Sequence, residues 1–452
     1  MTHVAIIGGG LAGLAAGVEL AGRGVQVAVL ESRPHLGGRA YSFLDEASGE
    51  VVDNGQHAMM GCYKHTLAFL ERIGATAKLT RQDDLRVAMI HKQHGEGMIA
   101  GAALPSPLHM LAGILRYRLL SRGERLRALL GGARFMAMHR KSDARLGRLT
   151  VEQLLVALGQ SENTRHCFWY PVALATLNER PERACAAPFA EVLARAFFAS
   201  RADSQFVLPK VGLSDLYTTD ARRFIESRGG RVELAVPVAG LDVSGDRCTG
   251  IRFRDGRTLA VDACVAAVPP RALHAIVPSV NGWGELETTP IVSVHLWFDR
   301  QVLRDDFTGL IGTPTQWLFN RTSLTANGDR PTGQTQCVSA VISAARDIVE
   351  RPTDEVVATV VADIRACVAA ARSAQVLRAV VIKEKHATIS LTPEAERRRP
   401  GARTRFKNLF LAGDWIQTGL PATIESAVLS GQSAATLVAE YLQGQYDAIA
   451  PG

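Results

Sequence analysis

The hydrophobic and polar positions at the start of the chain follow the order strand, turn, helix and strand. Residues 4–7 form a short apolar run rich in β-branched side chains, which is typical of a buried strand. A glycine-rich turn occupies residues 8–13, and small residues from 11 to about 22 predict a helix. A second apolar strand over residues 25–30 ends on the acid Glu31. This order is typical of a dinucleotide-binding unit.

Each glycine of the first turn has a separate role in such a unit. Gly8 permits the tight turn, Gly10 lets the backbone approach a pyrophosphate, and Gly13 lets the helix pack closely on the sheet. The N-terminus of the helix offers N–H groups and a partial positive charge to the phosphates. Glu31, eighteen residues after Gly13, is placed to accept hydrogen bonds from an adenosine ribose.

A second glycine turn follows within a few residues. Gly37 and Gly38 lie between Arg33 and Arg39, an arrangement suited to cradling the same phosphates. A plain nicotinamide-binding unit has no need of this turn. With it, the opening of the chain resembles the FAD-dependent amine oxidase and phytoene desaturase superfamily. The resemblance implies an FAD cofactor and an α/β fold with a GR2-type, Rossmann-like FAD-binding domain.

A second motif lies near the C-terminus. A buried strand is predicted over residues 408–412, followed by Gly413-Asp414-Trp415 and a small-residue helix expected to begin near Pro421. The resemblance implies that Asp414 binds the ribityl–pyrophosphate part of FAD and that the helix points its N-terminus at the flavin N1–C2 carbonyl. Reduced flavin is anionic at N1, so a helix dipole stabilises it. Pro421 suits a first helical turn because its missing N–H has no intrahelical partner there.

Residues 51–63 form a third string, in which a strand ends in an Asp-Asn-Gly turn. Turns of this kind lie over the flavin in the superfamily. Together with residues 171–178 and 408–427, the string resembles a narrower group, the squalene-associated FAD-dependent desaturases or hydroxysqualene dehydroxylases. His57 is a candidate proton donor near the flavin, or a neutral residue that only orients the loop. Asn178 is a candidate to face a substrate hydroxyl.

These motifs and the resemblance predict one cofactor site, and no metal site. In the superfamily, the valine matching Val238 contacts adenine through its backbone. The one catalytic candidate is His57. The predicted cofactor-binding residues are Gly8, Gly10, Leu11, Ala12, Gly13, Glu31, Ser32, Arg33, Gly38, Arg39, Gly55, Gln56, His57, Ala58, Val238, Gly413, Asp414, Ala422, Thr423 and Ile424.

Length and composition agree with a two-domain enzyme. The chain has 452 residues, which is long for one compact core, and its 47 % hydrophobic and 21 % charged content is ordinary for a globular protein. Seven cysteines, an odd number without a Cys-x-x-Cys pair, argue against a disulfide framework and a zinc site. The cofactor strand begins at once, leaving no room for a signal peptide, and no apolar stretch approaches about twenty residues. We expect a cytoplasmic protein.

The positive charge of the chain is concentrated in one stretch. Residues 101–142 contain eight basic residues and a single acid, Glu124, while the whole chain carries a net charge of +7. Leu108, Leu111 and Leu115 recur there at helical spacing. A basic amphipathic helix predicts either a membrane-surface or partner-docking element, or a stripe that closes the substrate pocket, and both can hold. We expect peripheral attachment to the inner face of the cytoplasmic membrane. Nucleic-acid binding is not expected, because no such motif accompanies the charge.

The two end motifs make the predicted FAD-binding domain discontinuous. It comprises residues 1–74, 212–273 and 402–445, and an inserted α+β substrate domain comprises residues 75–211 and 274–401, with the basic segment near 104–141. Residues 167–213 are expected to be largely helical. In the second insertion, strands are expected at 291–298, 336–343 and 377–384, with a helix from 353 to about 372. His295 and His386 are expected to be structural, and residues 397–399 to form a solvated loop.

The narrower resemblance implies that the enzyme converts hydroxysqualene, an apolar C30 isoprenoid, to squalene in squalene and hopanoid biosynthesis. The hydroxyl is allylic, so acid-assisted loss of water gives a delocalised cation, to which reduced FAD would deliver a hydride from N5. The protein must supply a proton, a dry aromatic-lined tunnel and a fixed flavin face. Squalene-synthase-like enzymes are possible upstream partners, and the sequence does not identify the electron donor.

Two alternatives remain open from the sequence. A phytoene-type carotenoid desaturase or an amine oxidase of the same fold would run the flavin in the opposite direction. A flavin-free lipid or prenyl-protein carrier, as the GDP-dissociation inhibitors are, is disfavoured by the intact glycines and the Gly413-Asp414 motif.

Overall fold

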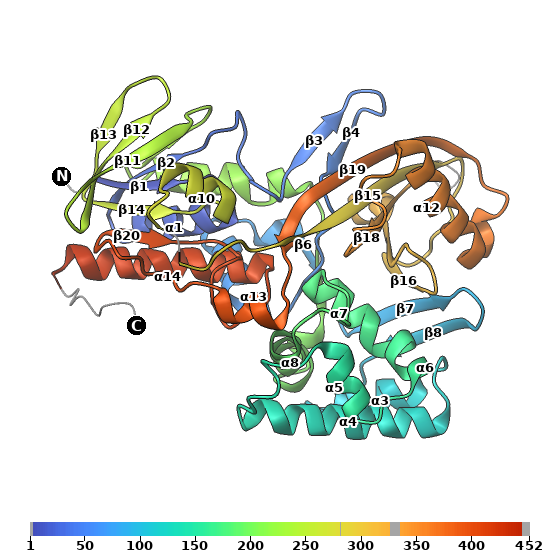
Figure 1. Cartoon of the computed structure of the whole chain (residues 1–452). Helices are drawn as coiled ribbons and strands as arrows, with labels where there is room; N and C mark the ends of the chain where they lie inside the picture. Colours follow the sequence, from blue (N-terminus) through green and yellow to red (C-terminus); the bar gives the residue numbers. More distant parts are fainter. Residues whose placement is uncertain (1–2, 281, 326–334, 445–452) are drawn as a thin grey trace.

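A five-stranded parallel sheet forms the centre of one lobe (Figure 1). The computed structural model describes residues 3–280, 282–325 and 335–444. In spatial order the strands of the sheet are β10 (Arg231–Glu233), β2 (Gln26–Leu30), β1 (His3–Ile7), β14 (Ala263–Ala266) and β20 (Leu409–Leu411). These strands come from three distant parts of the sequence, so the first and last motifs meet in one sheet. The α/β fold with a Rossmann-like FAD-binding domain is thereby confirmed.

Side chains of β1 alternate between the two faces of this sheet, and both faces are buried. Val4 and Ile6 pack among the helices on one face, whereas Ala5 and Ile7 share a core with a small antiparallel sheet on the other. The helices are α1 (Leu11–Gly22), α9 (Thr219–Glu226) and α14 (Ile424–Leu442). The antiparallel sheet contains β11 (Val238–Ser244), β12 (Arg247–Phe253) and β13 (Thr258–Ala260).

A seven-stranded mixed sheet forms the centre of the second lobe. Its strands, in spatial order, are β19 (Val376–Ile389), β15 (Thr288–Phe298), β18 (Gln336–Ile342), β17 (Trp317–Asn320), β16 (Phe307–Ile311), β7 (Arg86–His91) and β8 (Gly95–Ala100). Helix α12 (Thr353–Cys367) buries Val356, Val360 and Ile364 against it. Helix α11 (Arg321–Thr325) follows β17. Strands β16 and β17 were not predicted, because their short apolar runs carry no clear period of their own.

Helices from the first insertion pack below this sheet in Figure 1. They are α3 (Leu108–Arg116), α4 (Arg122–Arg140), α5 (Val151–Ala157), α6 (Glu162–Thr164), α7 (Tyr170–Leu177) and α8 (Ala186–Leu193), with π-helical turns at Arg165–Trp169 and Ala194–Phe198. The expectation of a largely helical stretch over 167–213 is wrong at its end. There β9 (Phe206–Pro209) pairs with β5 (Met59–Met60) and β6 (Leu79–Arg81), a distant pairing that a local pattern does not reveal.

The remaining elements are short. They are the hairpin β3 (Ser42–Asp45) and β4 (Glu50–Asp53), the helices α2 (Lys64–Arg72), α10 (Pro270–Ile276) and α13 (Pro393–Arg398), a π-helical turn at Ser214–Thr218, and 3-10 turns at Thr76–Lys78, Ala202–Ser204 and Ala369–Ala371. Across the described ranges, no helix combines the length and the hydropathy needed to span a bilayer.

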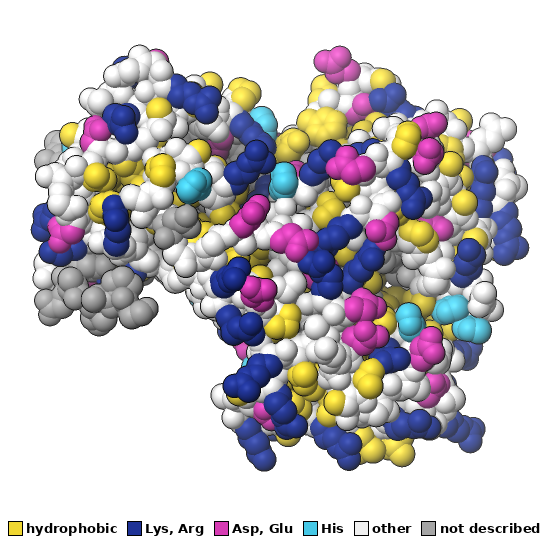
Figure 2. Space-filling view, in the orientation of Figure 1, with side chains coloured by type: hydrophobic (Ala, Val, Ile, Leu, Met, Phe, Trp, Pro, Cys, Tyr) yellow, Lys and Arg dark blue, Asp and Glu magenta, His cyan; other side chains and the backbone are white. Residues whose placement is uncertain are grey.

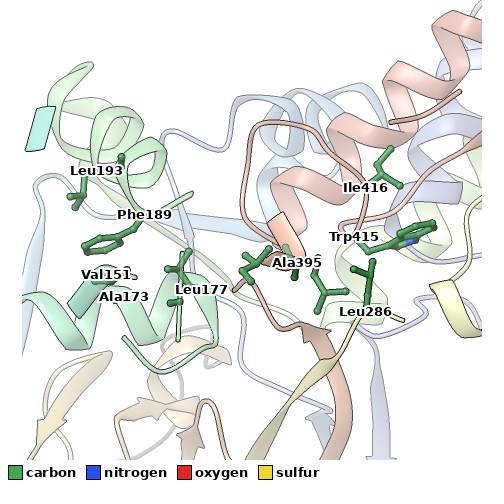
Figure 3. Close-up of a cluster of buried hydrophobic side chains, with 14 of the residues drawn as sticks. Val151, Ala173, Leu177, Phe189, Leu193, Leu286, Ala395, Trp415 and Ile416 are labelled. Carbon is green, nitrogen blue, oxygen red and sulfur yellow. The ribbon is translucent and has the colours of Figure 1, made fainter. Parts of the chain in front are cut away.

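One hydrophobic core joins the lobes. Figure 3 shows Leu177 and Phe189 of the helical part at one side of the cluster, and Ala395 and Trp415 at the other. The segment that carries the C-terminal motif and the inserted helices therefore belong to one continuous core. This continuity fixes the position of the cavity between them.

Candidate functional site

A cavity of about 1010 Å³ lies between the two lobes. One end is lined by the glycine turns and the polar residues of the three sequence motifs. The other end is lined by aromatic and aliphatic side chains of the inserted helices and the mixed sheet. The cavity therefore combines a polar compartment and an apolar compartment in one continuous space.

The first glycine turn forms the floor of the polar compartment. Gly8 has a φ of +109°, and a Cβ there would lie 2.5 Å from the Ala267 carbonyl oxygen, so only glycine fits. At Gly10 an added Cβ would meet only the Gly38 Cα, at 3.7 Å, because the residue faces open space. No side chain caps α1 and no acid lies in its first turn. Its N-terminus is thus directed at a ligand with negative charge.

Glu31 lies beside this turn at the end of β2. Its Oε2 accepts a hydrogen bond from the Gly9 N–H at 2.7 Å, and its Oε1 accepts one from the Arg33 N–H at 2.8 Å. The carboxylate is buried and lines the cavity. It therefore holds both glycine turns in place while presenting oxygen acceptors to the cavity.

The second glycine turn contributes one ion pair to the site. Arg39 donates from Nη2 to Asp414 Oδ1 at 2.5 Å and from Nη1 to the Ala387 carbonyl at 2.9 Å. Arg33 donates to the Gly38 carbonyl at 3.1 Å. Because the Arg39 charge lies against Asp414, it compensates the charge of that carboxylate inside the cavity.

Arg399 is a positioning residue that the sequence interpretation missed. The expectation of a solvated loop at residues 397–399 is wrong, because α13 ends at Arg398 and the Arg399 side chain is buried. Its guanidinium donates to four carbonyl oxygens of the loop that carries Asp414, those of Asp414, Trp415, Ile416 and Leu420, at distances of 2.5–3.3 Å. A run of three arginines gives no local signal that distinguishes a buried one from two exposed ones.

The helix of the C-terminal motif begins later than predicted. α14 starts at Ile424, and Thr423 caps it by accepting a hydrogen bond from the Ser426 N–H. The prediction that Pro421 lies in the first turn is wrong, since it precedes the cap. Ala422, Thr423 and Ile424 line the cavity, so the start of this helix faces the same space as the start of α1.

All the predicted cofactor-binding residues except Gly13 and Gly55 line the cavity. Gly13 instead serves packing, because a Cβ there would lie 1.9 Å from the Gly8 carbonyl oxygen. Gly55 belongs to the loop beside the cavity, where a Cβ would come within 3.7 Å of Ser293 Oγ. The residues that the structure gathers thus come from stretches some four hundred positions apart.

A buried polar cluster supports that loop from beneath. Asp53 is fully buried and accepts hydrogen bonds from Ser42 Oγ at 2.7 Å and from the Leu213 N–H at 2.9 Å. Its other carboxylate oxygen lies 3.2 Å from Arg321 Nη1. His295 bridges Ser339 Oγ and the Asp53 carbonyl, and burial lowers its pKa to about 4. His295 is therefore a neutral structural residue, as predicted.

Gln56 and His57 lie at the junction between the two compartments. Both polar atoms of the Gln56 side chain are buried without a hydrogen-bond partner among the described residues, although the residue lines the cavity. Burial lowers the pKa of His57, and the nearby Asp53 charge only partly opposes this effect. His57 is consequently neutral near pH 7. It is therefore better suited to orienting the loop than to donating a proton as a charged imidazolium. The unpartnered amide of Gln56 is available to hydrogen-bond a ligand in the cavity.

Asn178 lines the cavity, and hydrogen bonds within the protein use both donors of its amide and one acceptor site of its oxygen. Its Nδ2 donates to the Thr289 carbonyl at 3.3 Å and to Thr388 Oγ1 at 3.0 Å, and its Oδ1 accepts from the Ala344 N–H at 2.8 Å. The residue caps α7 in a left-handed conformation with φ of +49°. These hydrogen bonds connect α7 with β15 and β19, and contact between Asn178 and a substrate hydroxyl stays a prediction.

The apolar compartment draws on both insertions. The inserted helices supply Phe168, Trp169, Phe197 and Phe198. The unpredicted strands β16 and β17 supply further rings. The aromatic residues from these strands are Phe307, Trp317 and Phe319.

The family of the chain follows from its full length rather than from these residues alone. The family model of flavin containing amine oxidoreductases matches residues 11–439. The chain belongs to this family. It is an FAD-dependent oxidoreductase, and the uncapped α1 and the open space at Gly10 fit that cofactor.

The family's named members include near relatives of this chain. A hydroxysqualene dehydroxylase of Rhodopseudomonas palustris is 31 % identical, and one of Sinorhizobium fredii is 30 % identical. Each alignment covers 96 % of this chain and 98 % of the relative. These two relatives confirm the resemblance seen in the motifs. A putative protoporphyrinogen oxidase from Exiguobacterium shares the fold, with a TM-score of 0.70 at 15 % identity over 98 % of this chain and 99 % of that one.

Proposed function

We propose that this oxidoreductase removes the allylic hydroxyl of hydroxysqualene to give squalene. The observation that carries the proposal is the single cavity that joins the cofactor compartment to a long aromatic tunnel. Within the described part of the chain, the Lys, Arg, Asp and Glu residues that line the cavity all lie at the cofactor end. An uncharged tunnel suits a C30 hydrocarbon, and the relatives named above carry the name of this reaction.

The residues at the junction provide for one polar group of the substrate. Gln56 has an amide without a protein partner, which can hydrogen-bond a hydroxyl that reaches the flavin side of the tunnel. His57 is neutral and orients the same loop. In this arrangement the chain binds the departing hydroxyl without placing a fixed charge beside it. The proton that the hydroxyl needs in order to leave as water reaches it through a hydrogen-bonded group or a water molecule.

The reaction balances as a proton and a hydride added to the alcohol, giving the hydrocarbon and water. FAD, when bound in its reduced form, supplies the hydride. The aromatic faces of the tunnel stabilise positive charge that develops as the hydroxyl leaves, and the enclosing walls keep bulk water from capturing the allylic carbon. The glycine turns, Asp414 and the start of α14 would hold the cofactor so that the tunnel opens onto one flavin face.

The test compares two substrates and two states of the flavin. The purified holoenzyme, held without oxygen, is supplied with hydroxysqualene after photoreduction and with phytoene while still oxidised, and the products are identified by mass spectrometry. We expect squalene from the reduced enzyme and no dehydrogenated phytoene from the oxidised one. Gln56→Leu should slow squalene formation by roughly tenfold to a hundredfold, because the hydroxyl loses its partner. Dehydrogenation of phytoene with hydroxysqualene untouched would instead show a carotenoid desaturase.

A further inference from the structure

Exposed leucines and arginines gather on α3 and α4 and on the residues next to them. Among the described residues, large apolar side chains that are strongly exposed include six leucines between positions 104 and 130, each 38–57 % exposed. They are Leu104, Leu108, Leu111, Leu115, Leu126 and Leu130. We call these leucines, with the exposed Arg116, Arg118, Arg122, Arg127 and Arg134, the docking face. Apolar surface of this kind marks an interaction site.

Five of the six leucines lie on the outer sides of α3 and α4, and Leu104 lies just before α3. Leu108, Leu111 and Leu115 share one side of α3, while Met110 and Ile114 of the opposite side are buried. Leu126 and Leu130 lie one turn apart on α4, and the two helices contact each other. Figure 2 shows blue and yellow side chains alternating along the lower edge, where Figure 1 places α4.

The arginines of the docking face keep their charge available. None of the five forms an ion pair with another residue that the structure describes. The one acid of the stretch, Glu124, accepts hydrogen bonds from Ser121 and Ser161 and does not neutralise them. Arg125 is different, since it donates to the carbonyls of Leu115 and Leu120 and ties α4 to α3.

The docking face is continuous with the cavity. Leu108 and Leu111 are exposed to solvent and also line the apolar compartment. Behind them, Met110, Ile114 and Leu129 line the same space. The end of the tunnel that lies far from the glycine turns is therefore built from the helices that carry the exposed leucines.

We propose that the docking face binds the anionic surface of a lipid bilayer and that the tunnel opens into the acyl-chain region there. The leucines would enter the apolar layer, and the arginines would lie at the level of the lipid phosphates. The identity of the molecule that passes through the opening rests on the proposed function. The bilayer as partner rests only on the leucines, the charge and the position of the opening, so the two can fail separately.

Vesicle binding tests the partner without any turnover. The holoenzyme is sedimented with vesicles of phosphatidylcholine alone and of phosphatidylcholine with phosphatidylglycerol, at low and high salt. We expect binding to the anionic vesicles that weakens with salt. The triple variant Arg118→Glu, Arg122→Glu, Arg127→Glu should bind them at least a hundredfold more weakly, since each lost cation is worth about fivefold. The matched control Arg271→Glu, Arg372→Glu, Arg397→Glu changes exposed arginines elsewhere and should bind as the parent does.

Leucine variants test whether the face enters the apolar layer. The tryptophan fluorescence introduced by Leu126→Trp should be quenched by lipids brominated along the acyl chain. The fluorescence introduced by Leu377→Trp, at another strongly exposed leucine, should not be quenched. Equal binding of the arginine triple variant and the parent, or absence of quenching at position 126, would overturn the proposal. Concentration-dependent dimerisation that Leu126→Ser abolishes, without vesicle binding, would assign the face to a second copy of the chain.

Discussion

Arg399 is a buried arginine that holds the backbone of the loop carrying Asp414. Its guanidinium satisfies four carbonyl oxygens of that loop and an oxygen of Glu396 at 3.0 Å. The loop bears the carboxylate that Arg39 contacts, so its shape decides where Asp414 lies within the cofactor compartment. One side chain outside the cavity therefore sets the geometry of a residue inside it.

Replacing Arg399 should weaken FAD binding, although this side chain lies outside the cofactor compartment. Arg399→Gln leaves several carbonyl oxygens buried without donors, at a cost of about 1–3 kcal/mol each, so the loop should relax. We expect at least a tenfold rise in the Kd of FAD, measured by titration of the apoprotein with flavin absorbance. Arg397→Gln, at an exposed neighbour, should leave the Kd unchanged. An unaltered Kd in Arg399→Gln would show that the loop holds its shape by itself.

At the scale of elements, the close crossing of α1 and α14 places two helix starts around the cofactor compartment. Gly431 on α14 allows this crossing, because a Cβ there would lie 2.1 Å from the Ala12 carbonyl oxygen. Ala12 belongs to the first turn of α1 and lines the cavity. The packing of the two helices is thus coupled to the position of the anion-binding turn.

Gly431→Ala should separate the two helices. The clash with a backbone carbonyl cannot relax by rotating a side chain, so the free energy of unfolding should fall by about 1–3 kcal/mol, measured by denaturant titration. The same substitution at Gly123, near the start of α4, meets only the end of the Arg127 side chain at 3.6 Å. Gly123→Ala should raise stability by up to about 1 kcal/mol. A fall of equal size in both variants would contradict the packing argument.

The sequence predicted elements well where the signal was local. The limits of α1 match the prediction because a glycine lies at each end of a run of small residues, Gly10 before it and Gly22 at its end. The start of α14 was misplaced because a proline and a threonine cap both mark helix starts, and only packing decides between them. β9 was read as helix because its partners β5 and β6 lie more than a hundred residues earlier.

At the scale of the whole molecule, the two insertions complete a site that the FAD-binding domain only begins. The glycine turns and the Gly413-Asp414 motif predicted the cofactor end from sequence, since each motif is a short local pattern that can be recognised by itself. The far end depends on β16 and β17 meeting the inserted helices. The loops at the cofactor end also depend on the buried Arg399 and Arg321, which the sequence did not single out. Such contacts arise from tertiary folding and leave no periodic trace in the chain.

The chain is proposed to use this cavity to exchange an allylic hydroxyl for hydride. The most direct measurement is a single turnover without oxygen, using photoreduced holoenzyme equilibrated in heavy water so that the flavin carries transferable deuterium. Hydroxysqualene should give about one squalene per FAD, with deuterium at the carbon that lost the hydroxyl and reoxidation of the flavin at the same rate. Squalene that lacks deuterium at that carbon, or flavin that stays reduced while hydroxysqualene is unchanged, would contradict the claim.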